Sequence, residues 1–437
     1  MVENRKNAIG KQFIKYVSQN VFGMLGISLY ILADTYFISR AVGADGITAL
    51  NLVLPIYSLI FAFGQMIGVG SSIRFAVAKG QGKKEADYFF GNALFFGTLF
   101  AVIFIFIGLF APDQLLKLLG ANAVIQETGR TYTRIFMCFA PAFVWNHICN
   151  AFVRNDGNPS TAMLATLLSS LFNIVFDYVL MFPMGLGMAG AALATAISPL
   201  LGVMICLTHF LSGKSTVRLS FRGVSISRLW RSCQVGVSAF VGELSSAVIT
   251  MVFNYIILDL AGNMGVAAYG VIANTALVAM AMLNGVAQGA QPLISDCYGK
   301  GANKEASFVI RSAILTALVL GLVLYAGTYP FAAQITAVFN SEGIAELETY
   351  AVQGIRIYFI GFVFAGINIV GALALSAQEK ASEAFVISVS RGFVLILLFA
   401  FLLSRLWGLT GVWMSFPVTE LATTFVVIMG FAKKNKS

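Results

Sequence analysis

The sequence predicts an all-α membrane protein with about twelve transmembrane helices, and three observations support this prediction. First, 58% of the residues are hydrophobic and only 11% are charged, whereas about a quarter of the residues of a soluble domain are charged. Second, the mean hydropathy is +0.85. Third, the polar breaks are short. Because a spanning helix needs roughly 20 mostly apolar residues, the 437 residues leave no room for a separate soluble domain.

Polar or glycine-rich breaks separate the expected helices. In chain order, the helices are expected at residues 12–41, 46–78, 88–111, 128–153, 158–182, 187–212, 227–259, 265–297, 306–328, 345–376, 381–404 and 409–432. KGQGKK and GKGANKEA are interpreted as turns after the second and eighth helices, and RNDGNPSTA follows the fourth. The fifth helix ends near Pro183 and the sixth starts near Gly187. The longest break, residues 212–230, separates the sixth helix from the seventh.

Basic residues lie mainly on one side of the predicted membrane. That side includes Lys79, Lys83, Lys84, Arg154, Lys214, Arg218, Arg222, Lys300, Lys304 and Lys380, whereas the other has chiefly Arg40, Lys117, Arg130 and Arg405. By the positive-inside rule, both termini are expected to be cytoplasmic. This asymmetry accounts for the net charge of +9 without a nucleic-acid partner.

The two halves of the chain repeat each other. GADGITAL (43–50) recurs as GNMGVAAY (262–269), and GVGSSIRFAVAKGQGKKEA (68–86) recurs with small gaps as GVAQGAQPLISDCYGKGANKEA (285–306). GLGMAGAAL (185–193) matches LWGLTGVWM (406–414). We therefore expect two six-helix lobes related by a parallel repeat, residues 1–220 and 221–437, which is a common plan of secondary transporters.

Three polar side chains of the first lobe are predicted to lie at one depth. Asp34, Asp177 and Thr195 each lie about six to eight residues from the external end of their helix, which is roughly 9–12 Å. Asn173 precedes Asp177 by four residues and shares its helix face. The positions equivalent to the two aspartates in the second lobe fall at or next to Phe253 and Phe399, so the ionisable groups occur once.

Asp34 and Asp177 point to cation chemistry. A charge at the centre of a spanning helix costs about 2.5–3.5 kcal/mol, and such residues usually face the bundle interior or a watery cavity. Two carboxyl groups in a low-dielectric site do not both ionise easily, which suits a proton carrier. With a carboxamide and a hydroxyl they also form a set of hard oxygen ligands for Na⁺. A third interpretation is a buried polar network that only locks helix packing.

At these residues the chain resembles the multidrug and toxic compound extrusion (MATE) transporters of the MOP superfamily. The stretches that carry the resemblance are LADTYFISRAVGADGITALN, RNDGNPSTA, FNIVFDYVLMFPMGLGMAGAALATAIS and GAQPLISDCYGKG. The resemblance implies a V-shaped, twelve-helix antiporter in the bacterial inner membrane that exports cationic, amphipathic drugs in exchange for H⁺ or Na⁺. It implies no partner beyond small organic cations and the lipid bilayer, and a monomer is expected.

The resemblance also assigns residues. In the bacterial branch, the cation site carries over to Asp34, Asn173, Asp177 and Thr195, which could hold Na⁺, and Tyr132 and Asn150 correspond to further members of that network. The chain departs from the family at the proline that bends helix one in many members. Ser18, Gln19 and Asn20 occupy that region here.

Glu243, near the bilayer midplane in the seventh helix, is a further candidate for binding cation or substrate. Its alternative role is to pair structurally with a neighbouring serine or a basic residue.

No enzymatic activity or cofactor is predicted. The turns are not phosphate loops, His147 and His209 lack companions at ligand spacing, and the five cysteines lie singly.

Two alternative functions remain open at this point. One is a flippase for lipid-linked oligosaccharide or cell-wall precursors, which should carry a cluster of intramembrane arginines for a pyrophosphate. The other is a receptor-like or scaffolding protein, which would not need carboxylates at matched depth.

Overall fold

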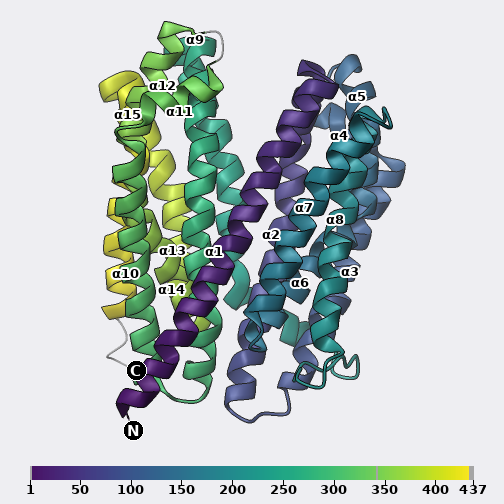
Figure 1. Cartoon of the computed structure of the whole chain (residues 1–437), viewed down its shortest axis with the longest axis vertical. Coiled ribbons are helices and arrows are strands. Elements are labelled where there is room, and N and C mark those ends of the chain that lie inside the picture. Colours follow the sequence, from purple (N-terminus) through teal and green to yellow (C-terminus); the bar gives the residue numbers. More distant parts are fainter. Residues whose placement is uncertain (1, 341–342, 433–437) are drawn as a thin grey trace. The chain divides into compact units, whose positions relative to one another are not determined.

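A computed structural model describes residues 2–340 and 343–432, and within these ranges every regular element is a helix (Figure 1). In chain order they are α1 (Val2–Ala41), α2 (Ala44–Gly80), α3 (Ala86–Phe110), α4 (Pro112–Leu118), α5 (Ala123–Cys138), α6 (Ala140–Asn155), α7 (Pro159–Met181), α8 (Gly187–Phe210), α9 (Ile226–Gly299), α10 (Asn303–Thr328), α11 (Ala332–Phe339), α12 (Ala345–Tyr358), α13 (Gly361–Ala377), α14 (Ala381–Val389), the π-helix η1 (Ser390–Val394) and α15 (Leu395–Ala432). α1 is one continuous helix that starts ten residues before the expected position and runs through the segment that lacks the proline.

The described residues contain eight helices, or ten with two bent pairs, that are long and apolar enough to cross a membrane. The pairs are α5 with α6, bent by 47°, and α12 with α13, bent by 48°. Pro141 lies in the first turn of α6, where its missing N–H and its ring cannot continue the preceding helix. Two further segments, the 74-residue α9 and the 52-residue run Ala381–Ala432, each hold two spans because the backbone is non-helical at Gly262 and at Gly408. With each bent pair counted as one span and each of these two segments as two, the described residues contain the twelve expected spans.

The chain packs into two compact units. One consists of Phe22–Leu244 and Ser295–Gly301, and the other contains the residues up to Val21, Ser245–Ile294 and the chain from Ala302 onward. The first unit places α7 on α8 and α2 on α6, and the second places α13 between α10 and α15. These units differ from the lobes 1–220 and 221–437 drawn from the repeat, which remain a prediction. The difference arises because α1 and α9 are long enough to take part in both units.

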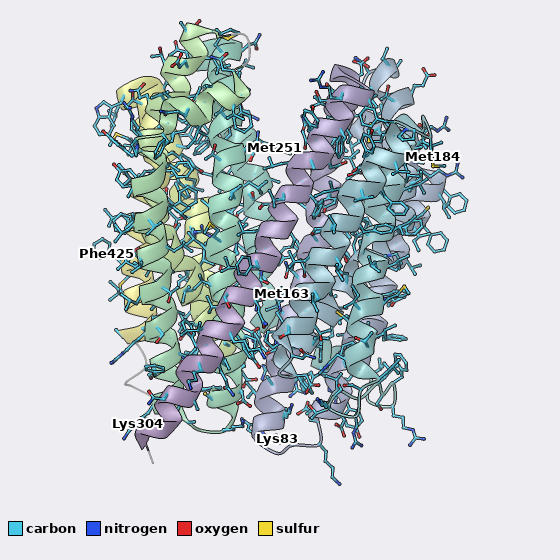
Figure 2. All side chains as sticks on the ribbon, viewed as in Figure 1. Lys83, Met163, Met184, Met251, Lys304 and Phe425 are labelled. Atoms are coloured by element: carbon cyan, nitrogen blue, oxygen red, sulfur yellow. The ribbon has the colours of Figure 1, made fainter. Side chains whose placement is uncertain are left out.

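Large apolar side chains cover the outside of both units, whereas many polar ones are buried. Leu99, Ile103 and Phe106 of α3 are more than half exposed, as is Phe425 of α15, which projects outward (Figure 2). Asn173, Asp177 and Glu420 are at most 1% exposed. A soluble protein would bury the first set and hydrate the second. This inverted distribution agrees with a multi-pass membrane protein.

The internal repeat is visible in the backbone. Gly43 and Gly262 have positive φ angles of 83° and 59°, and Gly187 and Gly408 have φ angles of 50° and 55°. Each pair occupies matching positions in the repeated sequences. Only glycine adopts this conformation at no steric cost, so both halves use the same residue to begin the same helices.

Candidate functional site

The centre of the candidate site is formed by α7 and α8, which pack side by side. Asn173 and Asp177 lie one turn apart on the buried face of α7, and Thr195 faces them from α8. In one orientation of its amide, Asn173 forms hydrogen bonds with both neighbours. Asn173 Nδ2 then donates to Asp177 Oδ2 at 3.1 Å, and Asn173 Oδ1 accepts from the Thr195 hydroxyl at 3.3 Å. All three side chains are at most 4% exposed.

Asp34 completes an acidic pair. It is 8% exposed on α1 and lies within electrostatic range of Asp177. Among the described residues, Asp34 Oδ1 and Asp177 Oδ1 are buried without a hydrogen-bond partner. A buried acceptor without a partner costs about 1–3 kcal/mol, and more if it is charged. A proton on either carboxyl group, or a small cation bound at the pair, would lower that cost.

Tyrosines surround this pair. Tyr132 of α5 is 2% exposed and lies within range of Asp34, Asp177 and Thr195. The structure therefore brings Tyr132 to the predicted network. Tyr132 lies on α5, which together with α6 covers the single helix expected at residues 128–153.

Glu243 of α9 approaches the same region through a pair of hydroxyl groups. Tyr30 Oη and Tyr57 Oη lie 2.8 Å apart. Tyr30 is within electrostatic range of Asp34, Asp177 and Glu243, and Tyr57 is within range of Glu243. These two tyrosines could not be predicted from the sequence, because nothing in an apolar helix distinguishes a functional tyrosine from a packing one.

Asn150 belongs to a separate group of polar side chains. Its Nδ2 donates to Asn146 Oδ1 at 2.9 Å, and its Oδ1 accepts from Thr166 Oγ1 at 3.4 Å. Thr166 precedes Asp177 on α7 by eleven residues, so this group lies about three turns from the acidic pair.

The second unit contains a buried ion pair that the sequence analysis missed. Arg391 Nε donates to Glu420 Oε1 at 2.6 Å, and Asn368 Nδ2 donates to Glu420 Oε2 at 2.7 Å. The Glu420 side chain is 2% exposed and that of Arg391 is 18% exposed. Arg391 lies in η1, and such wide turns often mark functional positions. The signal available in the sequence was Glu420 itself, an acidic residue in an apolar helix.

A third ionic centre lies at the end of α6. Asp156 Oδ1 accepts from Lys79 Nζ at 2.9 Å and also from Thr216 Oγ1. Asp156 Oδ2 accepts from His209 Nε2, Ser215 Oγ and the Thr216 backbone N–H, each at 2.9 Å. Burial alone would raise the pKa of Asp156, but the hydrogen bonds from Thr216, Lys79 and His209 outweigh it and hold that pKa below its usual range. Asp156 thus attaches the linker, residues 211–225, to the ends of α2 and α8.

The tautomer of His209 follows from its neighbours. Asn158 Oδ1 accepts from the Thr161 backbone N–H at 3.2 Å, which leaves Asn158 Nδ2 to face His209 Nδ1 at 3.1 Å. Nδ1 is therefore the acceptor, and His209 Nε2 carries the hydrogen donated to Asp156.

Spanning helices with an apolar outer face, a twofold repeated chain and an acidic pair buried inside one unit define a membrane transport protein. The MatE family model matches residues 20–179 and 239–402. The chain belongs to the MatE family, and the resemblance expected from its motifs is confirmed.

Relatives and solved structures agree with this assignment. The chain is 26% identical over 424 residues to the multidrug export protein MepA of Staphylococcus saprophyticus and 25% identical over 424 residues to MepA of Staphylococcus aureus. Each match covers 95% of this chain and 92% of the relative.

Among solved structures, the chain is similar to an outward-facing multidrug resistance MATE family transporter of the MOP superfamily, with a TM-score of 0.91 and 24% identity. It is also similar to a MOP superfamily transporter from Pyrococcus furiosus, with a TM-score of 0.90 and 24% identity. Both matches cover 97% of this chain and 96% of the other, and they show the fold.

Proposed function

We propose that the protein is a secondary antiporter that exports cationic, amphipathic compounds from the cytoplasm in exchange for H⁺, with Na⁺ as the other candidate coupling ion. The observation that carries the proposal is the acidic pair of Asp34 and Asp177, whose buried Oδ1 atoms have no hydrogen-bond partner among the described residues. The family and its multidrug export relatives support drug export as the activity.

The acidic pair provides a chemical basis for exchange. With a shared proton the pair carries one charge less, and release of that proton leaves a negative site that attracts a cation. Because Asn173 donates to Asp177 Oδ2, the free Oδ1 is the atom at which Asp177 would take up the proton or the ion. A proton and an organic cation that neutralise the same charge compete, and this competition couples their movements.

The direction of transport follows from the proposed topology. With both termini in the cytoplasm, the predicted depth of Asp34 and Asp177 lies nearer the external surface, where the coupling ion would enter. One charge moving across about 100 mV supplies roughly 2.3 kcal/mol, which sustains an approximately fiftyfold gradient of substrate. A single coupling ion is therefore sufficient for modest export.

The test is ethidium transport in proteoliposomes of defined orientation, with H⁺ and Na⁺ gradients imposed separately. Asp34→Asn and Asp177→Asn keep the shape of the side chain and remove the charge. Asp45→Asn is the matched control, since Asp45 is exposed in the first turn of α2. We expect one gradient to drive transport in the wild type and the control, and both buried variants to lose it.

Two results would contradict the proposal. Normal driven transport by Asp34→Asn and Asp177→Asn would show that the pair does not couple transport to an ion. Folded wild-type protein that transports under neither gradient would favour the flippase alternative and direct the next assay to lipid-linked substrates.

A further inference from the structure

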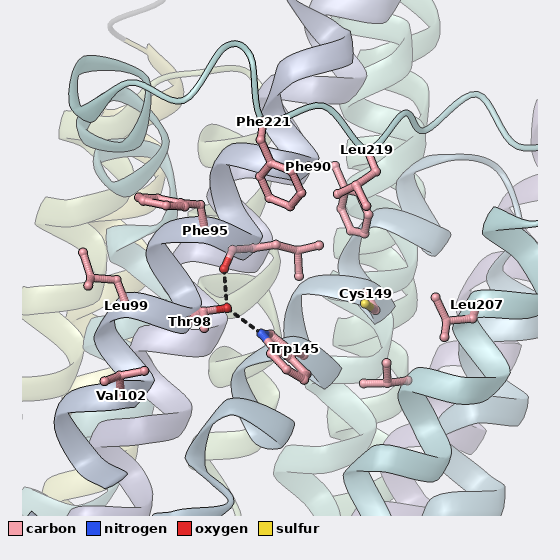
Figure 3. Close-up of a pocket in the computed structure, with 12 residues that line it drawn as sticks. Phe90, Phe95, Thr98, Leu99, Val102, Trp145, Cys149, Leu207, Leu219 and Phe221 are labelled. Carbon is pink, nitrogen blue, oxygen red and sulfur yellow. Dashed lines mark hydrogen bonds between the residues drawn. The ribbon is translucent and has the colours of Figure 1, made fainter. Parts of the chain in front are cut away.

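An apolar pocket opens on the outer side of the unit that contains the acidic pair (Figure 3). Its volume is about 530 Å³, within the usual range of about 300–1,000 Å³ for ligand sites. Helix α3 forms one wall from Phe90 to Val102, α6 and α8 form the opposite wall, and the linker closes one end with Leu219 and Phe221. We propose that this pocket binds an acyl chain of an anionic phospholipid, whose headgroup is held by the basic side chains of the linker.

The walls of the pocket suit a hydrocarbon chain. None of the lining residues carries a charge at neutral pH. The main polar donor, Trp145 Nε1–H, is already used, since it donates to Thr98 Oγ1 at 2.8 Å (Figure 3). The Thr98 hydroxyl in turn donates to the Leu94 carbonyl at 2.7 Å. A polar ligand would therefore find no free donor on these groups, whereas an alkyl chain needs none.

The size and position of the pocket match one leaflet of a bilayer. From Phe90 to Val102, α3 rises by roughly 18 Å, and half of a hydrocarbon core is roughly 15 Å thick. Leu99 of α3 and Leu207 of α8 are 56% and 43% exposed, so the pocket is open toward the surface that faces lipid. The linker end belongs to the cytoplasmic leaflet in the topology proposed above.

The linker is held against α3 by the backbone. A Cβ atom at Gly91 would lie 2.1 Å from the Ser220 carbonyl oxygen, so the absence of a side chain at Gly91 lets Ser220 pack directly on α3. The Ser225 backbone N–H donates to Asn92 Oδ1 at 2.8 Å. Both contacts fix the segment that carries Leu219 and Phe221 over the end of the pocket.

Charge identifies the kind of lipid. The linker contains Lys214, Arg218 and Arg222 and no acidic residue. Arg218 and Arg222 flank the two apolar residues that close the pocket, and the Arg218 side chain is 76% exposed although it lies 3.9 Å from Asp87. Each basic group near the surface strengthens binding to the anionic lipids of the cytoplasmic leaflet by roughly fivefold. The exposed Leu219 and Phe221 between them would place these groups at the level of the headgroups.

Trp145 is a natural reporter for this site, because its ring lines the pocket (Figure 3). The full chain is reconstituted in bilayers of unlabelled phosphatidylcholine. To these bilayers is added one lipid with brominated acyl chains, either phosphatidylglycerol or phosphatidylcholine. Bromine quenches tryptophan fluorescence on contact, and subtraction of the signal from Trp145→Phe isolates the Trp145 contribution. We expect brominated phosphatidylglycerol to quench Trp145 at an approximately 25-fold lower mole fraction than brominated phosphatidylcholine, which is about fivefold for each of Arg218 and Arg222.

Two variants and one control decide the outcome. Arg218→Gln with Arg222→Gln should remove the preference for phosphatidylglycerol, and Val203→Phe, which fills the pocket from α8, should weaken quenching by both lipids. Lys304→Gln with Arg311→Gln removes the same charge from the other unit and should leave the preference unchanged. Equal quenching of the wild type by both lipids, no quenching of Trp145, or a preference that survives loss of the linker arginines would each overturn the proposal.

Discussion

The attachment of the linker by Asp156 yields a quantitative prediction for Asp156→Asn. The variant keeps the size of the side chain but replaces one acceptor oxygen with an NH₂ group that faces donors. Asp156 has no exposed side-chain surface and accepts from Lys79, His209, Ser215 and Thr216. Breaking a buried ion pair by removing one partner costs about 3–5 kcal/mol. For a chain of 437 residues, we therefore expect an unfolding temperature lower by about 3–5 °C.

Limited proteolysis measures the same attachment locally. Lys214 and Arg218 flank the docked residues Ser215 and Thr216, so release of the linker should expose both basic residues to trypsin. Asp87→Asn is the control, because it removes only the exposed pairing with Arg218 at 3.9 Å, which is worth about 0–1 kcal/mol. If Asp156→Asn melts within about 2 °C of the wild type and is cleaved at the same rate, the attachment does not stabilise the fold.

The pH dependence of this contribution has a definite sign. The pKa of Asp156 in the folded protein is below its usual range, so the stability that Asp156 contributes is complete above its unfolded pKa of about 3.9. It is lost as the pH falls through the lower folded pKa. The difference in unfolding temperature between the wild type and Asp156→Asn should therefore stay constant from about pH 5 to 8 and shrink below about pH 4.

Three further substitutions test other contacts, each by thermal unfolding. Gly91→Ala should lower the free energy of unfolding by about 1–3 kcal/mol and expose the linker to trypsin, because the new Cβ would lie 2.1 Å from Ser220 O. Gly327→Ala is the control and should be neutral or stabilising, because the space around Gly327 is open. Glu379→Gly should stabilise by about 1 kcal/mol, since Glu379 has a φ of 59°; a lower unfolding temperature would show that its side-chain contacts outweigh the strain. Glu420→Gln should lower the free energy of unfolding by about 3–5 kcal/mol, because it leaves Arg391 without its anion. Replacing both partners, with Glu420→Leu and Arg391→Met, should recover most of this loss. If the double variant does not recover it, the broken ion pair is not the cause.

The sequence alone predicted the membrane class, the spans and the repeat. These properties depend on the length of each apolar run and on the fixed rise of a helix, both of which are local. The same rule predicts one depth for Asp34, Asp177 and Thr195, and it predicts that Asn173 shares the helix face of Asp177. Gly262 and Gly408, which interrupt the two longest helical segments, were recognisable because each has a glycine counterpart in the first half.

Only the tertiary structure decided which side chains meet. The Asn173 contact with Thr195, the approach of Glu243 to Tyr30 and the pairing of Arg391 with Glu420 depend on how each helix is rotated about its axis. In a soluble protein the apolar stripe fixes that rotation, but in a membrane the lipid-facing and core-facing sides are both apolar, so the sequence pattern leaves it open. The attachment of Thr216 to Asp156 and the closure of the pocket by Phe221 depend in addition on the path of the linker, which hydrophobic periodicity does not encode.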